Sequence, residues 1–541
     1  MLYKAIALFA ATMTACTCWS VPDSEVKALC DFYANAGGPE WSVSEGWAAT
    51  PSAVKEDPCT WYGVTCKAGH INALSLPRNN IKGVFVESFG DLTELISFDF
   101  GVNKLRGAYP QSMKKMTKLY AISVRENELS GPLDFSAFPE MQFAHMDFNH
   151  FSGDLSSLSK CTKLAVLGLT DNEISGSIPA EFAAMPKLQT LFLGGNNLTG
   201  AIPPLTATTL RTVDLGRNRL SGSVPLSAYL SVANLVELNL FNNELQGTLD
   251  EVRPHESLVV LDAHANRLTG EIPVALASGM TSMDILHLQD NLLSGPLSPA
   301  FTYTTVYSTN LTGNRLRCPL PPLPEGFEAS CVAATVPRPA APAVPGRPAK
   351  RGNVKPVEVV IHGEAKCPDM GSIEDIFADV VATLGEDVVD VKLGWIAKAN
   401  DAYPTGYWSL HGQTEVIGNA YTSCAAEAYG VTKALEFTKC LNVNISVIPT
   451  NVRGCAAASG LDFDALKACA LGEKGAALLK EGVALSDSYG AVWSPTIYID
   501  GQMYCLWHSS PCKATKESDF GKAVCDAYTG TRPAACAKYD N

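Results

Sequence analysis

Cys367-Pro368-Asp369-Met370 is the stretch of this sequence whose residue types most directly suggest chemistry. It follows an apolar run at 357–361 that is typical of a strand, and it opens a segment whose apolar residues recur at helical spacing. A cysteine at such a junction has its thiolate stabilised by the helix N-terminus. Cys367 is therefore predicted to be a reactive thiol. Met370 stands where a second thiol would release a trapped partner, and a thioether cannot do so.

The chain has 541 residues and is expected to hold two or three folded units. Its formal net charge of −14 argues against nucleic acid or an anionic membrane as the main partner. Residues 1–20 have the pattern of a secretory signal, and no later apolar run reaches the roughly 18 residues of a membrane span. We expect a soluble protein that is secreted or lysosomal (vacuolar), in a compartment where disulfides persist.

The cysteines behind this signal divide into six in the N-terminal part and nine in the C-terminal part. If eight of the nine pair with one another, one thiol is left, and Cys367 is the candidate. The alternative is that another cysteine is left over and Cys367 is bridged. No phosphate-binding loop, His-Glu-x-x-His or Gly-x-Ser-x-Gly motif occurs, so no cofactor or metal is predicted.

The segment from Leu74 to Leu316 repeats a Leu-x-Leu-x-x-Asn-x-Leu-x-Gly pattern, seen in full at 191–200. Each short strand is expected to turn its leucines inward, and each asparagine side chain to bond backbone groups where the coil turns. A single repeat cannot bury its apolar face, so the repeats must stack into a curved solenoid. Eleven asparagines recur every 22 to 25 residues: Asn79, Asn103, Asn127, Asn149, Asn172, Asn196, Asn218, Asn243, Asn266, Asn291 and Asn314.

This pattern resembles leucine-rich repeats, and the Gly-x-Ile-Pro ending at 176–179, 200–203 and 270–273 resembles their plant-type subclass. The segment 57–66, preceded by two tryptophans, resembles the N-terminal cap of plant-type repeat proteins. We expect disulfides Cys59–Cys66 and Cys318–Cys331 at the two ends, each stabilising by about 2–4 kcal/mol. Cys30 and Cys161 are expected to be buried, inert thiols.

Positions between the inward leucines line the concave face of such a solenoid. Their mixture of aromatic, acidic and histidine residues would suit a peptide, protein or glycan partner, although a merely solvated surface is an equal alternative. The candidate partner-binding residues are Phe192, Asp214, Arg217, Asn239, Phe241, Asp262, His264 and His287.

A second resemblance concerns the C-terminal third. The spacing of His411, Gly412, Glu415, Asn419 and Cys424 matches the signature of the gamma-interferon-inducible lysosomal thiol reductase family, with Ser409 and Val416 replacing two cysteines. The strand followed by Cys-Pro-Asp also resembles that family, whose usual form is Cys-Pro-Asp-Cys. The segment 493–501 resembles the stretch that carries the cis-proline of thioredoxin-like folds.

This resemblance implies a thioredoxin-like core with a helical insertion, acting on disulfides of protein substrates. Cys367 would be the attacking thiolate and Pro495 the cis-proline opposite it, with Pro368, Asp369, Met370 and Ser494 supporting the site. His411 would have a structural role. Without a cysteine at position 370, three outcomes stay open: an external thiol completes the cycle, the mixed disulfide is the useful product, or the domain is silent and serves recognition only.

The sequence thus predicts a multidomain chain, a leucine-rich-repeat solenoid of the α/β horseshoe type followed by a thioredoxin-like α/β domain. Its segments are a signal peptide (1–20), an N-terminal cap (21–72), repeats with a C-terminal cap (73–331), a Pro/Ala-rich linker (332–356) and the thiol-reductase-like domain (357–541). Cys505 and Cys512 are expected to pair, as are Cys525 and Cys536. Asn197, Asn310 and Asn444 are glycosylation candidates.

Overall fold

The computed structural model describes residues 21–224, 226–249, 252–303, 306, 308–324, 327–331, 355–400, 403, 405–409, 411–491, 494–506, 516–529 and 531–539. For 184, 368, 369, 446, 447, 505 and 506 it describes the backbone alone. The chain forms two compact units, the first ending at Thr199 and the second running from Gly200 to the C-terminus. The predicted signal peptide and nearly all of the predicted linker lie outside the described residues.

The first unit begins with an aromatic cap. Helix α1 (Asp23–Asn35) buries Phe32 against Trp41, with ring centroids 5.9 Å apart, and Trp47 lies 4.9 Å from Trp41. Strands β1 (Val64–Lys67) and β2 (His70–Ser75) pair antiparallel, and the Cys59–Cys66 disulfide closes the segment that leads into them, with an S–S distance of 2.03 Å. The cap therefore covers the apolar end of the repeat stack.

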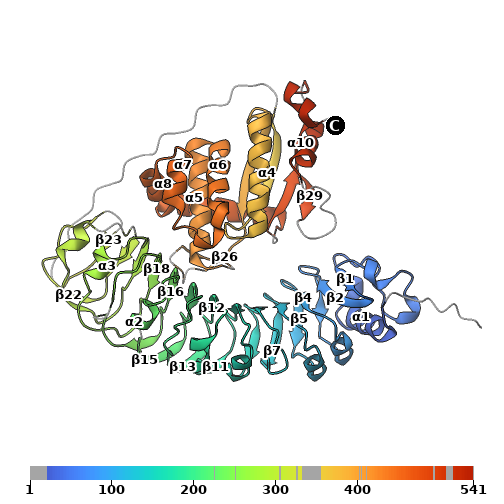
Figure 1. Ribbon diagram of the computed structural model, residues 1–541, viewed down its shortest axis with the longest axis horizontal. Helices are drawn as coiled ribbons and strands as arrows, with labels where there is room; N and C mark the ends of the chain where they lie inside the picture. Colours follow the sequence, from blue (N-terminus) through green and yellow to red (C-terminus); the bar gives the residue numbers. More distant parts are fainter. Residues whose placement is uncertain are drawn as a thin grey trace, which may run out of the picture. The chain divides into compact units, whose positions relative to one another are not determined.

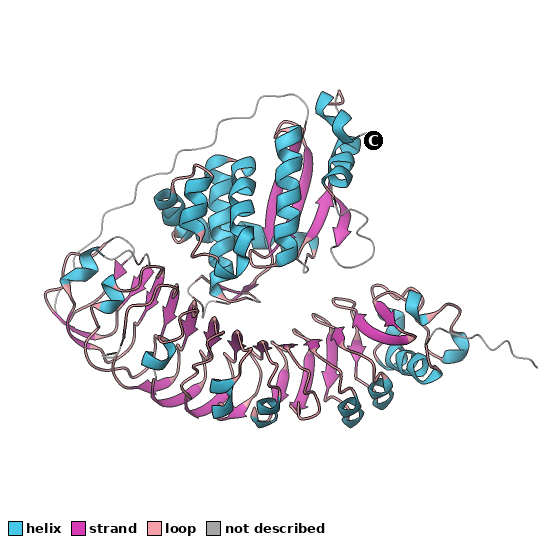
Figure 2. Ribbon diagram, viewed as in Figure 1, coloured by secondary structure: helices cyan, strands magenta, loops and turns pink. Residues whose placement is uncertain are grey.

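Strands at repeat spacing follow this cap. They pair parallel and in register, so that Ile122 of one strand lies beside Phe98 and Ala144 of its neighbours. Figure 2 shows these strands on one side of the stack and short helices on the other. The strands are β4 (Ser97–Asp99), β6 (Ala121–Ser123), β8 (Phe143–His145), β10 (Val166–Gly168) and β12 (Thr190–Phe192). The helical turns opposite are η4 (Glu87–Asp91), η5 (Gln111–Lys115), η6 (Ser156–Lys160) and η7 (Ala180–Ala184).

A second row of short strands runs beside the repeat asparagines. It contains β3 (Lys82–Gly83), β5 (Lys104–Gly107), β7 (Glu128–Pro132), β9 (His150–Ser152), β11 (Ser175–Gly176) and β13 (Asn197–Ala201). The Asn127 amide donates to the carbonyls of Phe100 and Val124, both at 3.0 Å, and its oxygen accepts from the Leu105 amide. The asparagines thus satisfy buried backbone groups at each turn, as the sequence indicates.

The second unit begins with repeats of the same kind, whose strands again pair parallel and in register. Asp214, Asn239, Asp262, His287 and Asn310 form one row across neighbouring strands. The Cys318–Cys331 disulfide closes the repeats at an S–S distance of 1.99 Å. The strands in this row are β14 (Thr212–Asp214), β16 (Glu237–Asn239), β18 (Val260–Asp262), β19 (Ile285–His287), β21 (Ser308–Asn310) and β23 (Phe327–Glu328). The remaining elements are β15 (Arg219–Ser223), β17 (Glu244–Gln246), β20 (Ser294–Pro296), β22 (Arg315–Arg317), α2 (Leu226–Tyr229) and α3 (Ala275–Ser278).

The C-terminal domain is built on a four-stranded sheet in the order β25-β24-β28-β29. Strand β24 (Val357–Gly363) is central: it pairs parallel with β25 (Val389–Trp395) and antiparallel with β28 (Thr496–Ile499), which continues into β29 (Gln502–Leu506). Helix α4 (Pro368–Leu384) connects β24 to β25 and lies beside the sheet (Figure 1). This is a thioredoxin-like α/β core, because two parallel strands are joined by a crossover helix and extended by an antiparallel hairpin.

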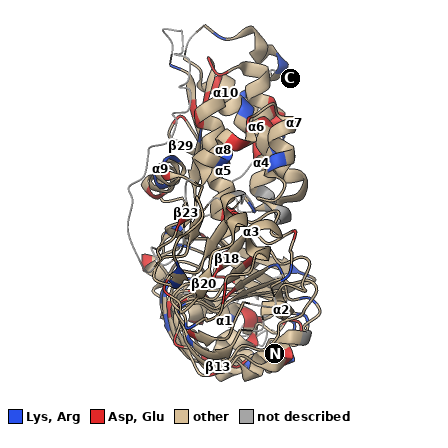
Figure 3. Cartoon of the chain, turned by 90° about the vertical axis from the view of Figure 1, so that its left-hand side faces the viewer, with Lys and Arg blue, Asp and Glu red and all other residues tan. Residues whose placement is uncertain are grey.

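In the described part of the chain between β25 and β28, five α-helices and the turn η9 (Asn442–Val447) form the helical insertion. The helices are α5 (Gln413–Tyr429), α6 (Val431–Leu441), α7 (Val452–Ala458), α8 (Phe463–Ala470) and α9 (Glu473–Tyr489). Two short strands, β26 (Lys398–Ala399) and β27 (Tyr407–Trp408), precede them, and α10 (Glu517–Ala527) follows the sheet. Figure 3 shows both acidic and basic positions on these helices. Among the described residues, no helix is both long and apolar enough to cross a membrane.

Among the described residues, three disulfides brace this domain. Cys424–Cys469 and Cys440–Cys455 join helices of the insertion, and Cys525–Cys536 ties α10 to the last turn of the chain, with S–S distances of 2.00, 2.05 and 2.04 Å. Cys367 carries a thiol. The pairing of Cys505 with Cys512 stays a prediction, because Cys512 lies outside the described residues.

The boundary between the compact units falls inside the repeats, although the predicted domain boundary is the linker. Val236, Val259, Val260 and Ile285 of the later repeats belong to the same buried apolar cluster as the core of the C-terminal domain. The later repeats and that domain therefore form a single compact unit.

Candidate functional site

Cys367 lies where β24 ends and α4 begins. It is the residue before the first turn of α4, its backbone is extended (φ −81°, ψ 120°), and its carbonyl accepts from the Gly371 amide at 3.2 Å. Its own amide donates to the Glu364 carbonyl at 3.0 Å, which closes the turn that leads out of β24. The thiol is partly buried, so solvent reaches it. The positive end of the α4 dipole favours the thiolate at this position.

The sulfur of Cys367 faces the segment that precedes β28. The Sγ atom lies 3.4 Å from the Ser494 carbonyl oxygen, and the Ser494–Pro495 peptide bond is cis. The Ser494 hydroxyl accepts from the Glu364 amide at 3.0 Å, which ties this segment to the cysteine loop. The structure thus brings Cys367, Ser494 and Pro495 together, as the resemblance implies.

The signature residues of helix α5 hold the cysteine loop from the other side. Asn419 Oδ1 accepts from the Ala365 amide at 2.9 Å, and Glu415 Oε1 accepts from the Lys366 amide at 3.0 Å. Residues 415 and 419 are four apart, so they share one face of the helix. This face fixes the two backbone amides just before Cys367.

Glu415 is buried and takes part in an ion pair with His411, whose Nδ1 lies 2.7 Å from Oε1. Burial opposes ionisation of Glu415, but the charge and hydrogen bond of His411 lower the pKa of this carboxyl below its usual value. Burial likewise opposes charging of His411, and the Glu415 carboxylate raises the pKa of the imidazole above its usual value. The Ser409 hydroxyl also donates to Glu415. Glu415 therefore stays charged, as its role of accepting from the loop amide requires.

Lys366 precedes the thiol, and sequence reasoning missed it. Its Nζ donates to Thr414 Oγ1 at 2.6 Å. Burial lowers the pKa of Lys366 to about 8, and the carboxylates of Glu237 and Glu415 oppose that shift. Its adjacency to Cys367 in the sequence was the only available signal.

Met370 occupies the position that the second cysteine holds in a Cys-x-x-Cys site, and its side chain packs in the domain core. It is fully buried in the apolar cluster of the domain. A Cβ added at Gly363 would lie 2.2 Å from Met370 Sδ, so the glycine at the end of β24 makes room for this side chain. Pro368 and Asp369 form the first turn of α4 as expected, but their side chains are not described.

Glu364, His411 and Glu415 each offer a ligand atom, and these three atoms lie within 4.8 Å of one another. This spacing would allow a cation, but Glu415 already accepts from the Lys366 amide, the Ser409 hydroxyl and His411. The cluster is better described as an ion-pair network that holds the cysteine loop.

The predicted partner-binding residues are less accessible than a bare solenoid face would be. In the first unit, Phe192 is buried. In the second unit, the Tyr403 hydroxyl donates to Asp214 Oδ2 at 2.7 Å, and the Tyr403 ring meets Phe241 edge-on at 5.5 Å between centroids. The buried members of the predicted set are Phe192, Asp214, Asn239, Phe241 and Asp262, and the partly buried ones are Arg217, His264 and His287.

The histidines of this set flank one buried carboxylate. His264 Nδ1 lies 2.6 Å from Asp262 Oδ1, and His287 Nδ1 lies 3.8 Å from Asp262 Oδ2. His264 stacks on Phe241 with ring centroids 5.0 Å apart. The sequence places these residues in adjacent repeats, and the structure brings them into contact without a nucleophile among them.

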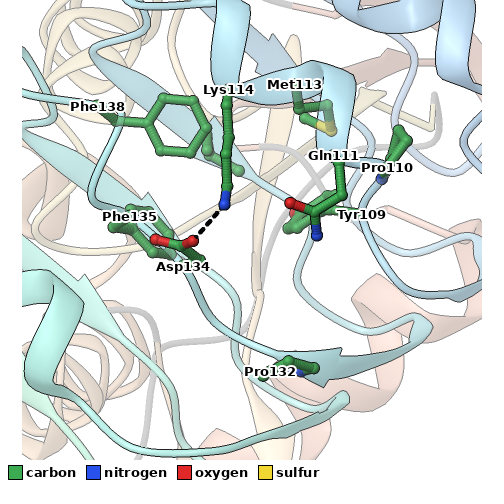
Figure 4. Close-up of a pocket in the computed structure, with 10 residues that line it drawn as sticks. Tyr109, Pro110, Gln111, Met113, Lys114, Pro132, Asp134, Phe135 and Phe138 are labelled. Carbon is green, nitrogen blue, oxygen red and sulfur yellow. Dashed lines mark ion pairs between the residues drawn. The ribbon is translucent and has the colours of Figure 1, made fainter.

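A pocket in the first unit lies on the side of the η5 turn (Figure 4). The Lys114–Asp134 ion pair spans it at 2.7 Å between Nζ and Oδ2. Its lining consists of Tyr109, Pro110, Gln111, Met113, Lys114, Ile122, Pro132, Asp134, Phe135 and Phe138. These side chains include no cysteine or histidine, so the pocket offers no thiol chemistry.

Of the predicted glycosylation sites, Asn197 and Asn444 have exposed side chains. Asn310 is partly buried and donates to Glu328 Oε2 at 3.0 Å. Attachment at Asn310 would therefore break this contact.

Comparison with protein families identifies both modules. The model of the gamma interferon inducible lysosomal thiol reductase (GILT) family matches residues 358–459, which include Cys367 and the signature of α5. The leucine rich repeat N-terminal domain matches residues 22–67, and a leucine rich repeat matches residues 187–208. The chain therefore combines a leucine-rich-repeat module with a GILT domain.

Several curated proteins are similar to part of this chain. The chain is 33% identical over 154 residues to Pollen receptor-like kinase 2 of Arabidopsis thaliana, covering 28% of this chain and 23% of that protein. It is 30% identical over 185 residues to Phytosulfokine receptor 1 of the same plant, covering 33% and 18%. It is 27% identical over 194 residues to the leucine-rich repeat-containing protein slrA of Dictyostelium discoideum, covering 36% of this chain and 14% of that protein. The chain thus spans less than a quarter of each relative.

Solved structures with a similar chain path include repeat receptors. The PEPR1–AtPEP1 complex has a TM-score of 0.49 at 24% identity, covering 57% of this chain and 49% of that chain. A plant ice-binding protein has a TM-score of 0.48 at 24% identity, covering 58% and 100%. These similarities do not bear on which partner this chain binds.

Proposed function

We propose that this chain is a secreted or endolysosomal protein in which the repeat module recognises a partner and Cys367 forms mixed disulfides with protein substrates. One observation carries the proposal: Cys367 is a solvent-reachable thiol at the N-terminus of α4, with its sulfur 3.4 Å from the Ser494 carbonyl. The five disulfides among the described residues support an oxidising compartment.

The chemical step is thiol–disulfide exchange. The Cys367 thiolate attacks one sulfur of a substrate disulfide, forms a new S–S bond to it, and displaces the other substrate sulfur as a thiolate. A small external thiol then attacks the sulfur on the substrate side of this mixed disulfide. Cys367 leaves as a thiolate, and the substrate carries a disulfide to the small thiol. Both steps balance without a second cysteine in the protein.

Neighbouring groups have distinct tasks in this proposal. The α4 N-terminus favours the thiolate over the thiol. Glu415 and Asn419 hold the loop amides and so fix where the sulfur points. The backbone beside Pro495 would align an extended substrate strand next to Cys367.

A non-catalytic interaction protein is the second candidate function, and the burial of Met370 favours it. A fully buried thioether at the position of the second thiol completes the domain core without any contribution to exchange. In that case the GILT domain would serve recognition only, and Cys367 would not accumulate adducts faster than an ordinary exposed thiol.

Trapping of an adduct distinguishes the two candidates. The folded protein is incubated with glutathione disulfide, and peptide mass spectrometry locates the mixed disulfide. We expect an adduct on Cys367 that forms at least tenfold faster than on an unstructured cysteine peptide, with no adduct on Cys30 or Cys161. Formation no faster than on that peptide, or no adduct at all, would contradict the exchange proposal and favour the non-catalytic one.

The proposed function also implies a class of partner and a location for the protein. The repeat module would take a protein or peptide, with a glycan as the alternative, and Asn197 and Asn444 would be glycosylated in the secretory pathway. Mass spectrometry of the secreted protein with and without N-glycosidase treatment tests the second point.

A further inference from the structure

The outward positions of the repeat strands differ between the two units of this chain. In β4, β6 and β8 the residues on either side of the inward one are partly or fully exposed, and Phe143 is 37% exposed. In β14, β16 and β18 all three residues of each strand are buried. The repeats have one geometry, so the extra burial in the second unit has a source outside the solenoid.

Apolar contacts account for part of this extra burial. Three successive strands, β16, β18 and β19, are preceded or opened by the apolar residues Val236, Val259, Val260 and Ile285. They are almost completely buried and belong to one cluster with the core of the GILT domain. Burial of four branched side chains is a substantial driving force for association.

The polar contacts around this apolar patch are complementary. Glu237 accepts at the N-terminus of α5, from the Gln413 amide at 3.1 Å and the Thr414 amide at 3.2 Å. The first amides of a helix lack intrahelical partners, and the helix dipole favours a carboxylate there. Asn239 orients this carboxylate with a 2.8 Å hydrogen bond. Gly412 has φ 86°, and a Cβ there would lie 2.6 Å from Glu237 Oε2.

Two further polar contacts flank the contact of Glu237 with the N-terminus of α5. Tyr403 donates to Asp214 at 2.7 Å, as described above. At the other side, Lys467 of α8 lies 2.5 Å from Asp284 Oδ1, with side-chain exposures of only 15% and 11%. A desolvated ion pair of this kind contributes to specificity, since a mismatched partner would leave a buried charge unpaired.

We propose that the outward face of strands β14 to β19 is a docking site for this chain's own GILT domain, and that an outside partner reaches this face only when the domain leaves it. The proposal is independent of whether Cys367 is catalytic. It assigns part of the predicted partner-binding set to an internal interface.

The docked face also reaches the cysteine loop. Lys366 Nζ donates to Thr414 Oγ1 at 2.6 Å, and the Thr414 hydroxyl and amide both bond Glu237. Displacement of the domain would therefore change the surroundings of the residue next to Cys367.

Carboxyl footprinting tests docking in the intact wild-type chain. A carbodiimide with a small amine modifies carboxylates that solvent reaches, and we expect Asp284, whose side chain is 11% exposed, to react at least tenfold more slowly than Glu140, whose side chain is 46% exposed. Modification of Asp284 as fast as that of Glu140 would overturn the proposal.

A variant that can be cut within the linker allows the affinity of docking to be measured. A protease site is inserted within 332–356, the folded protein is cut, and the two pieces are separated by size-exclusion chromatography. We expect them to elute together, with Asp284→Lys weakening their association at least tenfold and the exchanged pair Asp284→Lys with Lys467→Asp restoring it. The matched control is Gln142→Lys, because Gln142 occupies the position of Asp284 in a first-unit repeat. Separate elution of the wild-type pieces, or equal weakening by both lysine substitutions, would overturn the proposal.

Discussion

Cys367 and the two solenoid thiols, Cys30 and Cys161, put the same side chain in opposite environments. Cys30 lies inside α1, Cys161 follows η6, and both are fully buried. Burial raises the pKa of each of these thiols to about 11. Cys367 is reached by solvent and lies at a helix N-terminus. We therefore expect the position of a cysteine relative to a helix end and to solvent to decide whether it reacts in this chain.

The two regions also differ in what holds the sulfur in place. Cys161 donates weakly to the carbonyls of Phe135 and Phe138, which belong to the preceding repeat. The loop of Cys367 is held by Glu415 and Asn419, about fifty residues further along the chain. The loop of Cys367 thus depends on a contact from a distant part of the chain, whereas Cys161 contacts only a neighbouring repeat.

The largest effect is expected from removing the sulfur itself. Cys367→Ser should abolish both rapid alkylation and adduct formation with glutathione disulfide, because the remaining described thiols are buried. Peptide mass spectrometry measures the loss. Cys161→Ala is the control and should leave the rate of labelling at Cys367 unchanged. Adducts that persist in Cys367→Ser would contradict the assignment of Cys367 as the reacting thiol.

Met370→Cys should raise disulfide reductase turnover at least tenfold above wild type. Position 370 is one helical turn after Cys367, so a thiol there can attack the mixed disulfide and release the substrate. The assay is reduction of a fluorescent disulfide substrate with a small thiol as electron donor. Met370→Leu conserves volume and should show no gain. A folded Met370→Cys variant without increased turnover would mean that more than one residue is missing from the site.

Glu415→Gln should destabilise the GILT domain by about 1–3 kcal/mol, because a neutral amide replaces the buried carboxylate that pairs with the partly exposed His411 and accepts from the Lys366 amide. It should also slow alkylation of Cys367 by loosening the loop. Chemical denaturation and labelling kinetics measure the two effects. Glu427→Gln removes a more exposed ion pair with Lys474 and should change stability little. Equal effects of both substitutions would argue against a loop-holding role for Glu415.

A smaller effect concerns pH. Burial raises the pKa of Glu237 to about 7, and the Gln413 amide and Lys366 oppose this shift. Burial likewise raises the pKa of Asp214 to about 6, and the hydrogen bond from Tyr403 opposes this shift. The folded state thus holds protons that unfolded carboxyls, with pKa values of about 4, release. This stability is present below pH 4 and is lost as pH rises through 6 to 7. Lys366, whose pKa burial lowers to about 8, begins to lose its proton only at the upper end of this range.

The melting temperature of the second unit should therefore fall between pH 5 and pH 7.5. Glu237→Gln should flatten this dependence, since an amide does not titrate, while keeping much of the contact. The charged groups around these two carboxyls are Arg217, Asp262 and Lys366. A Glu237→Gln variant with the same pH dependence of the melting temperature as wild type would contradict the assignment.

Much of the architecture follows from local pattern. The asparagine spacing predicts the turns at which Asn127 and its counterparts bond the backbone, because each repeat needs only its neighbour. The junction at Cys367 and the cis bond before Pro495 also follow from short motifs. The sequence does not predict the contact of Glu237 with α5, because nothing in one repeat indicates what covers it. The roles of Lys366 and Glu364 likewise depend on a loop path that only tertiary structure fixes.

The most direct test of the central claim is a pH series of alkylation on the folded protein, with Cys367, Cys30 and Cys161 followed separately by peptide mass spectrometry. We predict that Cys367 labels rapidly with an apparent pKa well below the usual value of about 8.5. Cys30 and Cys161 should label only after denaturation. Labelling of Cys367 that also requires denaturation, or an apparent pKa at or above the usual value, would contradict an activated thiol and leave recognition as the function of the GILT domain.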